Sequence, residues 1–201
     1  LNSSMVHGLD MLTVFDLHEN YLESVPDGFF RDLYNLKQLS LSGNKLSSLN
    51  STTFQGLHSL NVLHLHDNRL KSIPNELFQG MPYLTILYLH ENKLVSLNPS
   101  TFQGLVWLSV LSLHVNDLTF LPDGLFQELR YLTVLSLYDN QLIALNSGVF
   151  HGLDSLNYLN LHRNHLTLLP VQLFEGLTGL NGLILSSNQL IALDSSIFHG
   201  L

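Results

Sequence analysis

The sequence predicts a curved, right-handed solenoid of the α/β type, built mostly of short strands and loops, with a parallel sheet on its concave face. Two observations predict this fold. Leucine, asparagine and phenylalanine each recur every 24 residues along the whole chain, and a fixed period of this length is typical of solenoids. Within each period, apolar and polar residues alternate over a few positions, as they do in a short, half-buried strand.

The three recurring columns are in phase with one another and are interrupted by no insertion. The first leucines of the units run from Leu12 to Leu180 in steps of 24. The asparagines are Asn20, Asn44, Asn68, Asn92, Asn116, Asn140, Asn164 and Asn188. The phenylalanines run in the same way from Phe30 to Phe198. We therefore expect a single domain over 1–201, with a partial repeat at 1–9 and eight 24-residue repeats over 10–201.

Each column has a structural interpretation. One strand per unit stacks into a parallel sheet, and its inward leucines share a core with the neighbouring units. We expect the asparagines to form a structural ladder that bonds backbone groups of adjacent units, because a buried polar side chain needs partners. We expect the phenylalanines to pack beneath the convex side. Turns with proline, such as Leu121-Pro122, alternate with turns such as Leu97-Asn98, which predicts two alternating loop conformations.

Composition excludes several classes of protein. The chain has 201 residues, of which 45% are apolar and 12% charged, and its formal charge is −8. This acidic balance argues against a nucleic-acid partner, which would meet a basic face. No apolar run reaches the roughly 20 residues of a membrane helix, and the first residues do not look like a signal peptide. Without cysteine there is no disulfide framework or thiolate site, and we expect no cofactor.

One unit, from Leu118 to Leu129, reads L-x-x-L-P-x-x-x-F-x-x-L. This pattern resembles the extracellular leucine-rich-repeat family, which includes Toll-like receptor ectodomains, lamprey variable lymphocyte receptors and Slit-type matrix proteins. The resemblance covers the whole chain and implies a leucine-rich-repeat solenoid. It implies the fold more strongly than the ligand, because the fixed positions of the family are core positions.

Members of this family usually close each end with a cysteine-bearing cap, and this sequence has none. An uncapped solenoid exposes a leucine-rich cross-section and an unpaired strand edge. Three explanations stay open: an internal segment of a longer protein, identical chains stacked into a fibre, or end units that tolerate exposure. Stacking has one supporting detail: Phe198-His199-Gly200-Leu201 followed by Asp10-Met11-Leu12 resembles the internal stretch from Phe150 to Leu156.

Histidine dominates one column of the expected concave face, where equal positions of neighbouring strands lie about 4.8 Å apart. This column reads His18, Ser42, His66, His90, His114, Tyr138, His162 and Ser186. His64 projects to the same face two residues before His66. Three interpretations stay open: a solvated column, a pH-responsive surface whose protonated imidazoles repel one another, or a weak zinc or copper site at His64, His66 and His90.

Two further columns place an acidic row beside a partly basic one. The first reads Glu19, Gly43, Asp67, Glu91, Val115, Asp139, Arg163 and Ser187, and the second reads Tyr21, Lys45, Arg69, Lys93, Asp117, Gln141, His165 and Gln189. They are either charge pairs on a solvated rim or part of a recognition surface with tyrosine anchors. The binding candidates on the concave face are His18, His64, His66, Tyr88, His90, His114, Tyr138, Tyr158 and His162.

The functional prediction follows from what the motifs do and do not include. The sequence has no hydrolase, P-loop, zincin or dinucleotide-binding motif, so we expect no enzyme. Asn2-Ser3-Ser4 and Asn50-Ser51-Thr52 are N-glycosylation acceptors. Together with the resemblance they favour a secreted or cell-surface protein. We predict non-catalytic recognition of a protein or glycan on the concave face, with a head-to-tail extracellular fibre as the alternative.

Overall fold

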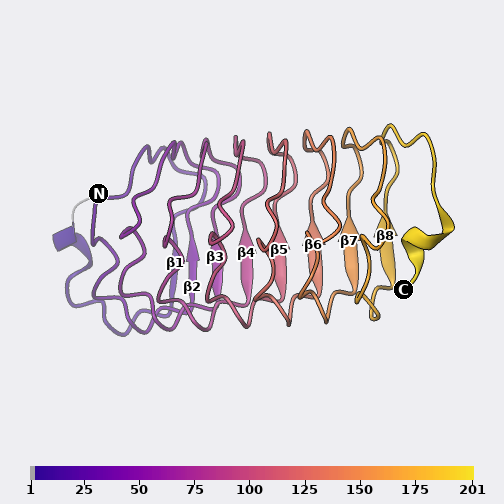
Figure 1. The fold of residues 1–201 in the computed structure, drawn as a ribbon. Helices are drawn as coiled ribbons and strands as arrows, with labels where there is room; N and C mark the ends of the chain where they lie inside the picture. The colour runs from indigo at the N-terminus through magenta and orange to yellow at the C-terminus, as the bar shows by residue number, and fades with distance from the viewer. Residues whose placement is uncertain (1–2) are drawn as a thin grey trace.

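The computed structural model describes residues 3–201 and contains one parallel sheet of eight strands, one strand in each coil of a solenoid (Figure 1). The strands are β1 (Val14–Asp16), β2 (Gln38–Ser40), β3 (Val62–His64), β4 (Ile86–Tyr88), β5 (Val110–Ser112), β6 (Val134–Ser136), β7 (Tyr158–Asn160) and β8 (Gly182–Ile184). Two 3-10 helices, η1 (Ser3–Val6) and η2 (Ser195–Phe198), lie at opposite ends. Neither has the length or apolar surface to cross a bilayer. The predicted leucine-rich-repeat solenoid is confirmed.

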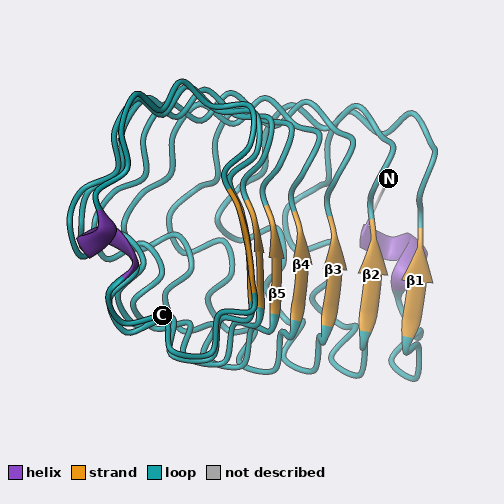
Figure 2. Cartoon of the chain, turned by 90° about the vertical axis from the view of Figure 1, so that its right-hand side faces the viewer, coloured by secondary structure: helices purple, strands orange, loops and turns teal. Residues whose placement is uncertain are grey.

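The strands pair in sequence order without any shift of register. Each strand residue faces the residue 24 positions later, as Val14 faces Gln38. Bonds between coils continue beyond the strands, since the Leu17 N–H donates to the Ser40 carbonyl at 2.9 Å. Figure 2 shows the strands side by side along one face, with loops making up the rest of each coil. Columns in the sequence are therefore columns of neighbouring side chains on the surface.

Leucines from the strands and phenylalanines from the loops fill the interior. The central strand residues Leu39 to Leu159 are fully buried. On the opposite side, the phenylalanine rings stack along the solenoid axis; Phe102 and Phe126, for example, have centroids 6.2 Å apart. The column is buried from Phe30 to Phe174, as expected. Phe198 is 37% exposed, because no further described coil covers its outer side.

The backbone explains why turns with proline alternate with turns that carry asparagine or aspartate. Coils with a proline turn carry a residue in the left-handed region two positions after the proline, at Gly28, Glu76, Gly124 and Gln172. In three of the four coils with asparagine or aspartate, at Asn50, Asn98 and Asp194, the side chain accepts a hydrogen bond from a backbone N–H two residues on; for Asn98 Oδ1 and Ser100 N the distance is 3.0 Å. The two turn chemistries give different local structures, so the predicted alternation of loops is confirmed.

Candidate functional site

The asparagine ladder joins neighbouring coils directly after the strands, beside the concave surface that holds the binding candidates. Asn116 Oδ1 accepts from the Leu94 N–H at 3.0 Å, while its Nδ2 donates to the carbonyls of Leu89 (3.1 Å) and Leu113 (3.0 Å). Equivalent bonds to the preceding coil are made by Asn44, Asn68, Asn92, Asn140, Asn164 and Asn188. Asn20 differs: it is exposed and donates only within its own coil, because no described coil with a matching strand precedes it.

Three imidazole rings and one phenol ring stack face to face on the concave side. The ring centroids of His66 and His90 are 4.4 Å apart, those of His90 and His114 are 4.2 Å apart, and those of His114 and Tyr138 are 4.2 Å apart. Adjacent planes differ by only 9°, 13° and 14°. We call these four residues the imidazole stack. In-register strands bring equal positions together, so the arrangement is a direct consequence of the repeat.

The imidazole stack is neutral over the physiological pH range. Burial lowers the pKa of His90 to about 3, and the neighbouring imidazoles act in the same direction. Burial likewise lowers the pKa of His114 to about 4 and depresses the pKa of His66. The Nδ1 atoms of the three histidines are buried and have no hydrogen-bond partner. A proton there would have no acceptor, so we place the ring proton on Nε2, where a ligand can accept it.

His64 and Tyr88 extend the imidazole stack towards the middle of the strands. The His64 and Tyr88 centroids are 5.0 Å apart, and the Tyr88 ring meets His66 and His90 edge to face. Burial lowers the pKa of His64. Strands β3 to β6 thus present one aromatic cluster, which we call the concave cluster. It comprises His64, His66, Tyr88, His90, His114 and Tyr138.

The remaining predicted binding residues lie apart from the concave cluster. The exposed ring of His18 bonds Asp16 at 2.8 Å, and this bond raises the His18 pKa. His162 Nδ1 lies 2.8 Å from Ser186 Oγ. The half-buried ring of Tyr158 covers Gly182, where a Cβ would come within 2.3 Å of the tyrosine Cδ2. Tyr21 is 81% exposed on the rim.

The histidines are arranged for stacking rather than for chelation. The structure brings together His90, Glu91 and His114, whose ligand atoms lie within 4.8 Å of one another, rather than the set of His64, His66 and His90 that the sequence offered as a weak alternative. The His90 and His114 rings are 4.2 Å apart and nearly parallel, so their in-plane lone pairs lie in parallel planes. A metal ion needs those lone pairs to converge at about 2.1 Å. Binding one would therefore require the imidazole stack to open.

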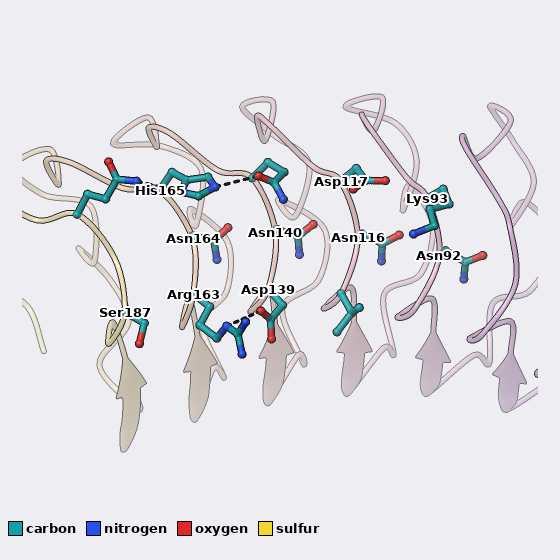
Figure 3. A pocket seen from close by; sticks show the side chains of 13 residues that line it. Asn92, Lys93, Asn116, Asp117, Asp139, Asn140, Arg163, Asn164, His165 and Ser187 are labelled. Carbon is teal, nitrogen blue, oxygen red and sulfur yellow. Dashed lines mark hydrogen bonds and ion pairs between the residues drawn. The ribbon is translucent and has the colours of Figure 1, made fainter.

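A polar groove of about 700 Å³ runs beside the concave cluster, between the acidic and the partly basic columns (Figure 3). Arg163 Nε and Asp139 Oδ1 form an ion pair at 2.8 Å along its acidic edge. His165 Nε2 lies 2.8 Å from Gln141 Oε1, and Gln189 Nε2 lies 3.0 Å from His165 Nδ1. Lys93 and Asp117 line the other end.

The polar groove was not predicted as a groove, although its residues stand in the two columns that the sequence singled out and in the asparagine ladder between them. The one ion pair found there in residues 3–201 lies within the acidic column rather than between the two columns. Loop shape, which the repeat pattern does not specify, creates the hollow. Strand spacing could have indicated the Arg163–Asp139 contact, because these residues are 24 apart.

A comparison with protein families identifies the chain. The family model described as "Leucine rich repeat" matches residues 10–70, 58–118 and 107–166. The chain belongs to the leucine-rich repeat family. No curated protein matches this leucine-rich repeat chain by sequence.

Solved structures place the leucine-rich repeat chain near Toll-like receptors. It is 33% identical, with a TM-score of 0.92, to a chain of the TLR13–ssRNA13 complex, and the match covers 100% of this chain and 29% of that one. The LRR protein LIC12759 of Leptospira interrogans is 35% identical, with a TM-score of 0.80, over 91% of this chain and 45% of that one. A chain of the Drosophila Toll–Spatzle complex is 28% identical, with a TM-score of 0.80, over 98% and 30%. The chain spans less than half the length of each. The expected similarity to Toll-like receptors is confirmed.

Proposed function

We propose that residues 1–201 form one leucine-rich-repeat domain that acts outside the cell as a non-catalytic recognition module, binding a protein partner on its concave face. The concave cluster is the observation that carries this proposal. Six aromatic side chains from four consecutive coils meet there. The fold does not need them, because the same two columns hold serine in other coils, as at Ser40 and Ser42. Aromatic side chains presented in this way are typical of protein contact sites.

The chemistry of the surface favours a protein over other partners. The concave cluster is uncharged at neutral pH because the imidazole pKa values are low, and the polar groove beside it carries charges of both signs. A glycan is the alternative partner. The formal charge of −8 disfavours nucleic acid; the RNA in the TLR13 complex is a ligand of that protein. Protein complexes also occur among the neighbours, as with Toll and Spatzle.

A selection experiment followed by binding measurements on two matched variants tests the proposal. A display library of secreted protein domains is selected on the wild-type chain, and each clone is measured on Tyr88→Ala and on Gln103→Ala, an exposed change in a convex loop. We expect clones whose affinity falls about tenfold or more with Tyr88→Ala alone. Glycan and single-stranded RNA arrays are probed with the same variants. A glycan or RNA whose binding depends on Tyr88, together with no protein clone that shows this dependence, would overturn the choice of a protein partner.

The extracellular location rests on a glycan acceptor that is well placed in the structure. Asn50 is exposed in a convex loop, and the Thr52 hydroxyl donates to Asn50 Oδ1 at 3.2 Å. The other acceptor, Asn2, lies outside the described residues. Expression through a eukaryotic secretory pathway should add a glycan at Asn50, visible by mass spectrometry. Asn98 is the control, because Pro99 blocks its otherwise similar turn; secretion with an unmodified Asn50 would remove this support.

A second candidate function is a subunit of a head-to-tail fibre, and the asparagine ladder supports it. If two copies stacked in phase, Asn20 would meet the Leu185 carbonyl and the Leu190 N–H of the preceding copy, as Asn44 meets Leu17 and Leu22. Met11 and Ile191, each 79% exposed, lie in the two end coils. Electron microscopy of the purified chain should then show filaments that Asn20→Asp shortens, whereas a monodisperse monomer excludes this function.

A further inference from the structure

A stripe of exposed aromatic side chains lies on the flank of the solenoid, three residues before the starts of β4, β5 and β6. The aromatic stripe consists of Tyr83, Trp107 and Tyr131, which are 59%, 50% and 52% exposed. The rings of Trp107 and Tyr131 stack with centroids 4.7 Å apart and planes 11° apart. Each ring therefore restrains the other before any partner arrives.

The aromatic stripe is an addition to the fold, because the same column does without aromatic residues elsewhere. It holds Asn35, Ser59, Ser155 and Gly179 in other coils, whose strands pair in the same register. None of the described residues accepts a hydrogen bond from Trp107 Nε1 or from the hydroxyls of Tyr83 and Tyr131. Exposed apolar groups gathered in this way mark contact surfaces.

A shallow pocket of about 340 Å³ adjoins the aromatic stripe, lined by Val106, Gln127, Glu128, Arg130 and Tyr131. The Glu128 carboxylate is occupied by the Gly104 N–H, which donates to it at 2.8 Å. Arg130 is exposed and takes part in none of the ion pairs found in residues 3–201. The pocket thus has an apolar wall next to a guanidinium that forms no ion pair with the described residues, although the Glu128 carboxylate lines the same pocket.

We propose that the aromatic stripe and this pocket form a second protein-binding surface, which takes an extended acidic peptide segment carrying an aromatic or aliphatic side chain. The apolar side chain packs against Val106 and Tyr131, and a carboxylate pairs with Arg130 in the two-pronged geometry that guanidinium favours. Tryptophan, tyrosine and arginine carry most of the binding energy at protein interfaces, and the pre-ordered ring pair lowers the cost of ordering on binding. The exposed Arg130 guanidinium beside the apolar wall matches an acidic peptide better than a neutral sugar, which offers no carboxylate to it.

Peptide selection with two variants tests this surface. A phage library of random dodecapeptides is selected on the wild-type chain, and the enriched peptides are synthesised. Trp107→Ser and Arg130→Thr are the variants, because serine and threonine occupy the same columns at Ser59 and Thr178 and are compatible with the fold. Trp107 is the sole tryptophan of the chain, so its fluorescence reports binding at this place. Tyr88→Ala on the concave face is the control.

We expect enriched peptides that combine an aspartate or glutamate with a neighbouring apolar residue and that shift the Trp107 emission. Their affinity should fall about tenfold or more with Trp107→Ser and with Arg130→Thr, and stay unchanged with Tyr88→Ala. When the peptide carboxylate is replaced by an amide, the wild-type chain and the Arg130→Thr variant should bind the peptide with equal affinity. Peptides that lack an acid or ignore both variants overturn the proposal. So does a dimer in sedimentation that Trp107→Ser abolishes, because a second copy would then occupy the surface.

Discussion

At the scale of the residue, each coil depends on one position in the left-handed region directly after the imidazole column. The residues there are Glu19, Gly43, Asp67, Glu91, Val115, Asp139, Arg163 and Ser187, with φ between 50° and 62°. Left-handed backbone costs an ordinary L-residue about 1–2 kcal/mol, whereas asparagine and aspartate tolerate it. Val115 is the one β-branched residue among them, and its branched side chain makes this backbone the least favourable of the eight.

Replacing Val115 by asparagine should therefore stabilise the chain. We expect Val115→Asn to increase the free energy of unfolding by about 1 kcal/mol, which corresponds to a rise of about 2–4 °C in Tm. Asp67→Val, a change in the opposite sense at the equivalent position two coils earlier, should lower Tm by a similar amount. Calorimetry checks both; a Tm that falls with Val115→Asn would show that the valine makes a compensating contact.

The asparagine ladder gives a second prediction at this scale. Asn116→Ala leaves the buried Leu94 N–H and its partner carbonyls without a hydrogen bond, which should cost about 2–4 kcal/mol. Asn20→Ala removes only bonds to exposed carbonyls in the same coil and should cost less than about 1 kcal/mol. Urea unfolding measures both, and hydrogen exchange should speed up at the Leu94 amide. Equal losses for the two variants would contradict a ladder that acts between coils.

At the scale of the element, the convex turns are constrained by close contact between coils. Gly152 has a φ of +90°, and a Cβ there would lie 2.5 Å from the Gln127 carbonyl oxygen. Gly104 has a similar φ of +84°, but a Cβ there would meet nothing within 4 Å. The two glycines occupy the same position in different coils. Substituting each of them in turn therefore separates the cost of the positive φ from the cost of steric overlap.

We expect Gly104→Ala to cost about 1 kcal/mol through φ alone, and Gly152→Ala to cost about 1–3 kcal/mol more, because the coil must also move away from the new methyl group. Thermal unfolding of the two variants under the same conditions gives the difference. If Gly152→Ala lowered Tm less than Gly104→Ala, the turn next to Gly152 would move away from the new methyl group at little cost in free energy.

At the scale of the whole molecule, the concave cluster makes stability depend on pH. The pKa values of His64, His66, His90 and His114 are all lowered in the folded chain, to about 3 for His90 and about 4 for His114. Between these values and about 6.5 the unfolded chain binds more protons than the folded one, so stability rises with pH in this window. It is fully present above about pH 6.5 and is lost on acidification. The raised pKa of His18 acts in the opposite sense, but that ring is exposed.

Acidification from about pH 7.5 to about pH 5 should lower the free energy of unfolding by on the order of 2 kcal/mol. The double variant His90→Tyr and His114→Tyr should flatten this dependence while keeping the rings stacked, because Tyr138 already stacks in the same column. His151→Gln, an exposed change outside the cluster, serves as the control. A double variant with the wild-type slope would show that other groups govern the acid response.

The sequence by itself determined the solenoid, the number and register of its strands, and the alternation of its turns, because a strict 24-residue period forces equal residues into equal places. It also put His66, His90 and His114 in one column. Only the tertiary structure decided that their rings stack with buried Nδ1 atoms, which lowers the pKa of each ring, to about 3 for His90 and about 4 for His114, and disfavours a metal site among them. Tertiary packing likewise created the polar groove and the aromatic stripe with its pocket. Those features depend on side-chain rotamers and on the distance between loops, and neither is specified by a pattern of residue types.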